Sequence, residues 1–168
     1  MSRHDRCLTT GETPRQPLAI VFGRPFPLVS SVIERYNPKE RFLHLDEKAN
    51  GIEKLKQYIA NFVDRRCPVA GGCPVMNTAI EADDGNPVLR ARAAKALRFW
   101  LGRLQVIVEH AGERGETRPG VDPKAVATVI VASLEGALMM SRLKRNDEPL
   151  RIIQSHLSRY LENEVAVE

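Results

Sequence analysis

The amino-acid sequence predicts an all-α protein, a bundle of about five to six helices. From residue 28 onward, apolar residues recur at the three- and four-residue spacing of amphipathic helices, and no stretch alternates as a β-strand does. Asn86-Pro87 and Asp122-Pro123 each place a capping side chain before a proline, which favours the start of a helix. With 168 residues, 43% of them apolar, the chain can bury a hydrophobic core.

Residues 1–27 have a different character from the rest of the chain. Prolines and glycines interrupt them, and residues 18–22 alone could form a short extended run. A helix is predicted from Leu28 to Tyr36, where Asn37-Pro38 ends it. We therefore expect an irregular N-terminal segment over 1–27 and a helical domain over 28–168.

Five further helices are predicted after that boundary. Their ranges are 52–66, 74–82, 86–111, 123–145 and 149–162. The helix over 86–111 has a broad apolar face and a second, narrower strip formed by Val88, Phe99 and Val106. Two apolar strips predict that this helix is contacted on two sides.

The predicted helix over 123–145 is apolar nearly all round. A domain of this size cannot easily surround such a helix, so a second subunit is expected to cover part of it. Small residues would let a partner helix approach closely; they are Ala132, Ser133, Gly136 and Ala137. The sequence therefore predicts a homodimer.

Composition excludes several classes of protein. The net charge of +4 is not concentrated in a basic arm, so charge alone does not indicate nucleic-acid binding. No apolar run approaches the roughly 18 residues of a membrane span, and the first twenty residues carry charges in place of a secretory signal. Three cysteines are too few for a disulfide scaffold. We expect a cytoplasmic protein without membrane contact.

Nothing in the sequence forms a catalytic or metal-binding pattern. Cys67 and Cys73 are separated by five residues, which is not a usual zinc spacing, and the histidines stand alone. Glycine-rich phosphate loops and nucleophile-elbow motifs are absent from the sequence. We expect no enzyme, no metal and no cofactor.

Small-molecule binding is better supported than catalysis. Arg103 lies near Phe99 and Trp100, and Glu135 interrupts an otherwise apolar helix that also carries Met139. Polar groups beside aromatic and methionine side chains are typical of ligand pockets. A core with a few long side chains that reach solvent would give the same pattern, and the sequence leaves both interpretations open.

Several short motifs, taken in order, resemble one known domain. The first motif is GCPVMNTAIE at residues 72–81, and the second is Asn86-Pro87-Val88-Leu89-Arg90, which opens the long helix with Trp100. They are followed by Gly115-Glu116-Thr117-Arg118 before Asp122-Pro123, and then by Leu134-Glu135-Gly136-Ala137-Leu138. This order resembles the C-terminal domain of TetR-family transcriptional regulators, and the resemblance covers roughly residues 28–163.

The resemblance implies a dimeric, all-helical effector-binding domain that dimerises through its last two long helices, here 123–145 and 149–162. The effector would be a small, mainly apolar organic molecule. Its candidate contacts are Tyr58, Phe62, Cys73, Met76, Asn77, Phe99, Trp100, Arg103, Leu104, Glu135 and Met139. The candidate dimer contacts are Val126, Ile130, Ser133, Gly136, Ala137, Met140, Leu150, Ile153, Leu157 and Leu161.

The N-terminus departs from the family pattern. Family members carry an N-terminal helix-turn-helix that binds operator DNA, and residues 1–27 show no such pattern. We therefore expect no DNA-binding residues in this chain. Two alternatives follow: a dimerisation partner that removes a full-length regulator from DNA, or a small-molecule-binding protein without DNA contact.

Overall fold

The computed structural model describes residues 20–21, 24–25, 38–64, 72–82 and 85–167, and most of them are helical. The α-helices are α2 (Gly51–Asp64), α3 (Pro74–Ala82), α4 (Pro87–Glu113), α5 (Pro123–Lys144) and α6 (Glu148–Tyr160). A 3-10 turn, η1 (Pro38–Phe42), precedes α2, and a π-helical turn, η2 (Leu161–Val165), follows α6. The antiparallel strands β1 (Ile20–Val21) and β2 (Arg24–Pro25) are two residues each, so the all-α prediction is confirmed.

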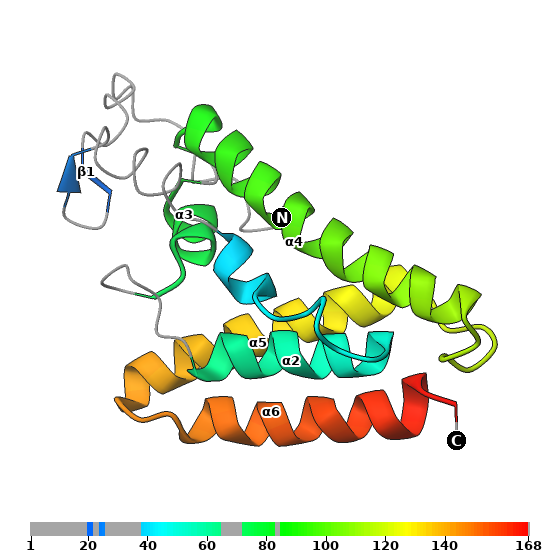
Figure 1. Ribbon diagram of the computed structural model, residues 1–168. Coiled ribbons are helices and arrows are strands. Elements are labelled where there is room, and N and C mark those ends of the chain that lie inside the picture. Colours follow the sequence, from blue (N-terminus) through cyan, green and yellow to red (C-terminus); the bar gives the residue numbers. More distant parts are fainter. Residues whose placement is uncertain (1–19, 22–23, 26–37, 65–71, 83–84, 168) are drawn as a thin grey trace, which may run out of the picture.

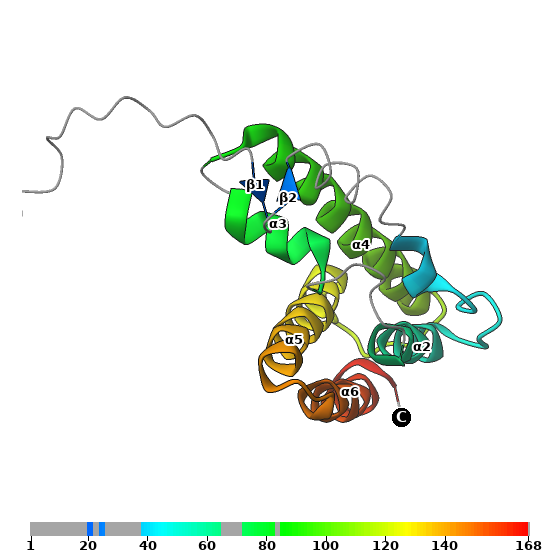
Figure 2. The same ribbon diagram turned by 90° about the vertical axis from the view of Figure 1, so that its left-hand side faces the viewer.

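The helices form a bundle with one oblique member. In Figure 1, the axes of α2, α5 and α6 are nearly parallel, with α6 running opposite to α5, and α4 crosses above them. Figure 2 looks nearly along those three helices and shows them clustered, with α3 and the two strands beside the N-terminal part of α4. Helix α5 packs against both α4 and α6 and therefore lies between them.

Capping side chains start the helices where the sequence predicts them. The Oδ1 atom of Asn86 accepts a hydrogen bond from the backbone N–H of Leu89 over 3.1 Å. The Oδ1 atom of Asp122 accepts from the backbone N–H of Lys124 over 2.9 Å. Each bond satisfies one of the free N–H groups in a first helical turn, so the two Asx-Pro signals are real helix starts.

The ends of the predicted helices differ slightly from those of the structure. Helix α4 continues to Glu113 because the stop comes only at Gly115, which has a left-handed φ of +70°. Helix α5 ends one residue early, at Lys144, since Arg145 takes the left-handed conformation. The helix predicted over 28–36 lies outside the described residues.

The loop that follows α4 forms hydrogen bonds with the first residue of α2 and with the last described residue of the chain. The backbone N–H of Gly51, the first residue of α2, donates to Glu116 Oε2 over 2.7 Å, and Arg114 Nε donates to Glu116 Oε1 over 2.6 Å. The backbone N–H of Val167 donates to the Glu116 carbonyl over 3.2 Å. Three distant segments therefore meet at one glutamate.

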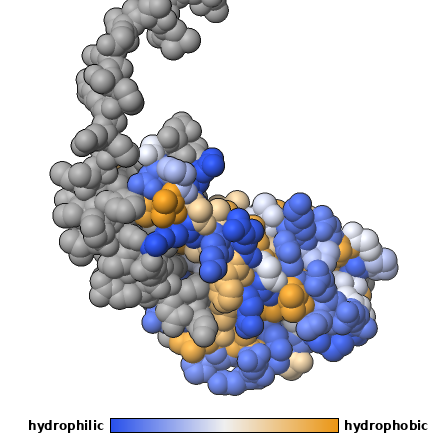
Figure 3. Space-filling view, turned by 90° about the horizontal axis from the view of Figure 1, so that it is seen from above, coloured by the Kyte–Doolittle hydropathy of each residue, from blue (hydrophilic) through white to orange (hydrophobic). Residues whose placement is uncertain are grey.

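The core contains the apolar faces of α2, α4, α5 and α6, with Trp100 and Tyr58 as its largest fully buried side chains. The second apolar strip of α4, by contrast, is exposed: Val88, Phe99 and Val106 are 40–52% accessible. Seen from the α4 side, the apolar surface is broken into patches between hydrophilic side chains (Figure 3). The contact predicted on this second side of α4 is therefore not made within the described residues, beyond the Phe42 ring against Phe99.

Candidate ligand-binding site

An apolar cavity of about 290 Å³ lies between α3, α4 and α5. Its lining residues are Val75, Met76, Ala79, Leu97, Trp100, Leu101, Thr128, Val131, Ala132 and Glu135. The cavity is close to the lower size of small-molecule sites, which are mainly apolar with a few polar groups.

Local sequence explains why these residues face one another. Pro74 starts α3 beside the buried Cys73, and the short helix then turns Met76 and Ala79 toward α4. Opposite them, the face of α5 that lines the cavity carries Thr128, Val131, Ala132 and Glu135 at the i, i+3, i+4 and i+7 positions of one helical stripe. Ala79 and Ala132 add little bulk to the two opposing sides of this cavity.

Glu135 is the ionisable group in this lining. Both of its carboxylate oxygens are sealed from solvent, and neither has a hydrogen bond of ordinary geometry to another described residue. Burial raises the pKa of Glu135, although the neighbouring Cys73 thiol and the charge of Arg41 act in the opposite direction. The structure therefore favours the neutral acid at this position.

Cys73 is fully buried next to Glu135. Burial, helped by the nearby carboxylate, raises the pKa of the Cys73 thiol far above its ordinary value. A thiol that stays protonated is a poor nucleophile and a poor metal ligand. No cluster of three or more potential metal ligands occurs in the part of the chain that the structure describes.

The cavity contains part of the predicted ligand-binding set. Met76, Trp100 and Glu135 line it, and Cys73 lies beside Glu135. The predictions for the remaining residues are not supported by their positions. The side chains of Tyr58, Phe62 and Leu104 are buried in the core away from this lining, Asn77 does not line it, and Phe99, Arg103 and Met139 are exposed.

These differences have a simple physical cause. The apolar face of a helix can pack into the core or border a cavity, and periodicity does not distinguish the two. Arg103, for example, lies over the ring of Phe42, 5.4 Å from its centroid, instead of facing Glu135. The missed lining residues on α5 had a readable signal, namely small or β-branched residues spaced at three and four positions from Glu135.

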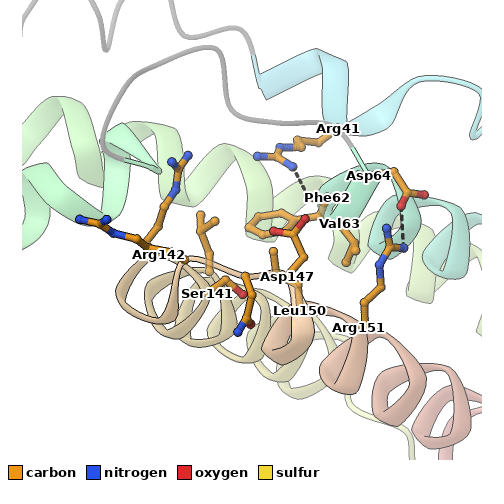
Figure 4. A pocket seen from close by; sticks show the side chains of 12 residues that line it. Arg41, Phe62, Val63, Asp64, Ser141, Arg142, Asp147, Leu150 and Arg151 are labelled. Atoms are coloured by element: carbon orange, nitrogen blue, oxygen red, sulfur yellow. Dashed lines mark hydrogen bonds and ion pairs between the residues drawn. The ribbon is translucent and has the colours of Figure 1, made fainter.

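A second hollow lies at the other end of α5. This groove of about 540 Å³ is bounded by η1 and by the ends of α2, α5 and α6. Figure 4 shows Arg41, Arg142 and Arg151 around it, with Arg151 Nη1 paired to Asp64 over 2.8 Å. The buried Arg41 donates a hydrogen bond to the Phe62 carbonyl over 2.7 Å. This bond links η1 to α2 and so fixes the position of one wall of the groove.

The predicted dimer contacts divide into two groups. Six of them are buried in the core of this chain and leave no surface for a partner: Val126, Ile130, Ala137, Leu150, Leu157 and Leu161. Their burial does not support a direct contact with a partner, because a helix that is apolar all round does not reveal which face its own core takes. Ser133, Gly136, Met140 and Ile153 keep accessible surface.

Comparison with known proteins identifies the domain. Residues 51–157 match the family model of the tetracyclin repressor-like C-terminal domain. The HTH-type transcriptional repressor DhaR of Mycobacterium sp. (strain GP1) is 25% identical over 105 residues, which are 62% of this chain and 52% of DhaR. The chain thus spans about half the length of this curated relative.

Two solved structures agree with this match. A TetR transcriptional regulator from Chloroflexus aurantiacus J-10-FL is 33% identical with a TM-score of 0.75, over 83% of this chain and 71% of that chain. A TetR-family regulator from Cytophaga hutchinsonii is 27% identical with a TM-score of 0.67, over 83% of this chain and 66% of that chain. This chain belongs to the TetR family of transcriptional regulators, and residues 51–157 are its family C-terminal domain.

Proposed function

We propose that this chain binds a small organic effector in the α3–α4–α5 cavity and transmits that binding to a homodimer interface, as the sensing part of a cytoplasmic transcription regulator. Membership of the TetR family supports a regulatory role. In this proposal residues 28–168 form the ligand-binding and dimerisation domain, preceded by the separate segment 1–27, which lies mostly outside the described residues.

One observation carries the proposal: helix α5 presents a different surface on each of three sides. Val131 and Glu135 border the cavity. Ile130 and Leu134 are fully buried in the core. A third side exposes apolar residues to solvent. A ligand that moves α5 therefore acts on the exposed side as well, because the helix is one rigid element.

The exposed side of α5 has the features of a dimer contact. Val129, Met140 and Leu143 are 40%, 46% and 78% accessible, and Ile152 on the neighbouring α6 is 59% accessible. Among the described residues outside its own stretch of helix, nothing lies within 4 Å of the place where a Cβ at Gly136 would be, so a partner helix has room to approach there. Exposed apolar residues grouped in this way mark protein–protein contacts.

Sedimentation velocity tests the interface. Met140→Asp should weaken dimerisation at least about a hundredfold, because an unpaired charge buried at an interface is strongly destabilising. Val106→Asp is the matched control, since Val106 is equally exposed, at 45%, but lies on α4. A Met140→Asp variant that dimerises like the wild type would place the interface elsewhere.

A second measurement tests the link between cavity and interface. Cumene, an apolar probe, should shift the indole signal of Trp100, the single tryptophan of the chain, and at saturation change the dimer dissociation constant by about fivefold or more. A shifted Trp100 signal with an unchanged dimer dissociation constant would instead indicate a small-molecule-binding protein without regulatory coupling.

A further inference from the structure

The accessible wall of the α3–α4–α5 cavity is apolar throughout, as far as the described residues form it. Its lining residues are aliphatic or aromatic side chains and a methionine, apart from Thr128 and Glu135. The hydroxyl of Thr128 donates a hydrogen bond to the Lys124 carbonyl of its own helix over 2.7 Å. That donor is therefore already used within α5 and is not offered to a ligand.

The carboxyl group of Glu135 lies behind this wall. Neither of its oxygens has accessible surface, and its polar partner is the thiol of Cys73, which is itself fully buried. The part of Glu135 that a ligand in the cavity can touch is accordingly its methylene stem. Both polar residues of the lining thus contribute carbon to the wall.

Such a wall treats the carbon and the polar atoms of a ligand differently. Each apolar group that leaves water for the cavity gains affinity in proportion to the surface it buries. A hydroxyl, carbonyl or ammonium group loses its hydrogen bonds to water and gains no partner from the wall, which is costly. The cavity therefore favours molecules that carry no hydrogen-bonding group.

The volume of the cavity limits the size of such a molecule. An apolar cavity of about 150 Å³ inside a protein stays dry and binds benzene. The α3–α4–α5 cavity, at about 290 Å³, is roughly twice as large. By this comparison it holds a molecule of about nine to twelve carbon atoms.

We propose that the effector is a small hydrocarbon of this size without hydrogen-bonding groups, and that the cavity selects it by offering polar groups no partner. The inference rests on the proposed function in one respect, namely that this cavity is the effector site. It adds the chemical class of the effector, and it makes the cost of desolvation, in place of a specific polar contact, the source of selectivity.

Three probes of nearly equal size and shape test the class. Cumene carries two methyl groups on the carbon next to its ring, and 1-phenylethanol and 1-phenylethylamine replace one of them by a hydroxyl or an ammonium group. The single indole N–H cross-peak of Trp100 in a ¹⁵N-correlated spectrum reports occupancy for all three. We expect cumene to bind about tenfold or more tightly than 1-phenylethanol and about a hundredfold or more tightly than 1-phenylethylamine.

A matched pair of variants tests the cause of this selectivity. Met76 lines the cavity and is only partly buried, so its replacement is tolerated by the fold. Met76→Gln has nearly the same length but brings an amide into the wall, and it should lower the ratio of cumene to 1-phenylethanol affinity about fivefold or more. Met76→Leu keeps the wall apolar and should leave that ratio within about twofold of the wild type. A thermal melt of each variant verifies folding.

Each contrary result has a distinct meaning. If 1-phenylethanol or 1-phenylethylamine binds the wild type as tightly as cumene, the cavity accommodates a polar group and the hydrocarbon class is overturned, while the cavity remains the effector site. An unchanged ratio in Met76→Gln would overturn the proposed cause, the lack of a polar partner in the wall. If all three probes leave the Trp100 signal unmoved, the cavity takes no ligand and the proposed function fails as well.

Discussion

Glu116 and Glu135 are the same residue type in opposite surroundings. Glu116, in the α4–α5 loop, accepts hydrogen bonds from Arg114 and from the backbone N–H of Gly51, and the pKa of its carboxyl is lowered chiefly by Arg114. Glu135, in the middle of α5, has no comparable bonds, and burial raises the pKa of its carboxyl. The first glutamate joins distant segments of the fold, whereas the second lies buried with the Cys73 thiol as its polar neighbour.

The two glutamates also differ in how tightly their surroundings are packed. Around Glu116 the packing is tight, since a Cβ at Gly51 would lie 2.6 Å from the Cβ of the fully buried Ala111. Around Glu135 there is a cavity. Polar groups that are satisfied inside the protein rigidify it, and unsatisfied ones reduce its stability.

The largest effect is expected where the packing is tightest. Gly51→Ala should destabilise the chain by about 2–3 kcal/mol, because the new methyl group forces α2 away from Ala111 and from Glu116. Urea unfolding followed by circular dichroism measures this change. Gly102→Ala is the control: nothing lies within 4 Å of its Cβ position inside α4, so it should stabilise the chain by about 0.5–1 kcal/mol. Equal effects of the two changes would contradict the tight contact.

A smaller loss is expected from Glu116→Gln, about 1 kcal/mol at neutral pH, because the partly exposed carboxylate is screened by solvent. Since the pKa of Glu116 is lower in the folded chain, the unfolded chain binds more protons in acid. This stabilisation is complete above the ordinary pKa near 4.5 and disappears as the pH falls through the folded-state pKa. Stability curves of wild type and variant should therefore converge in acid, and a constant gap would refute the electrostatic origin.

Local signals in the sequence predicted this fold well. Asn86-Pro87 and Asp122-Pro123 mark helix starts because a capping bond involves residues two or three positions apart. The short helix α3 also has the predicted limits, and it begins at a proline. These signals depend on residues within one helical turn of each other, so tertiary packing does not alter them.

The candidate site was predicted less well because it depends on packing. Glu135 stands out in sequence as a charge within an apolar helix, and Trp100 as the single tryptophan, and both line the cavity. Tyr58 and Phe62 carry the same kind of aromatic signal but point into the core from α2. Which face of α5 meets its own chain depends on how α4 and α6 pack against it, and the periodicity of α5 does not encode that packing.

Glu135→Met should have the opposite sign from Glu116→Gln and stabilise the chain by about 1 kcal/mol at neutral pH, because an apolar side chain replaces an unsatisfied carboxyl. The pKa of Glu135 is raised on folding, so the wild type is most stable below the ordinary pKa and loses stability as the pH rises through the raised value. The variant should lack this loss in urea titrations at several pH values. Glu109→Met, at an exposed glutamate of α4, should change little; a destabilised Glu135→Met variant would show that the carboxyl is satisfied in the fold.

The smallest effect tests whether the charged groove contributes to stability in the way Glu116 does. Asp64 and Arg151 are 2.8 Å apart but more than half exposed, at 54% and 58%. Arg151→Ala should therefore cost only about 0.5 kcal/mol, and this loss should shrink in molar salt, since exposed ion pairs are weak and screened. The Arg151→Lys variant keeps the charge, so its free energy of unfolding in urea should lie between those of the wild type and of Arg151→Ala. A loss above about 2 kcal/mol, unaffected by salt, would mean that the α2–α6 contact depends on this pair and that polar groups hold both ends of the bundle.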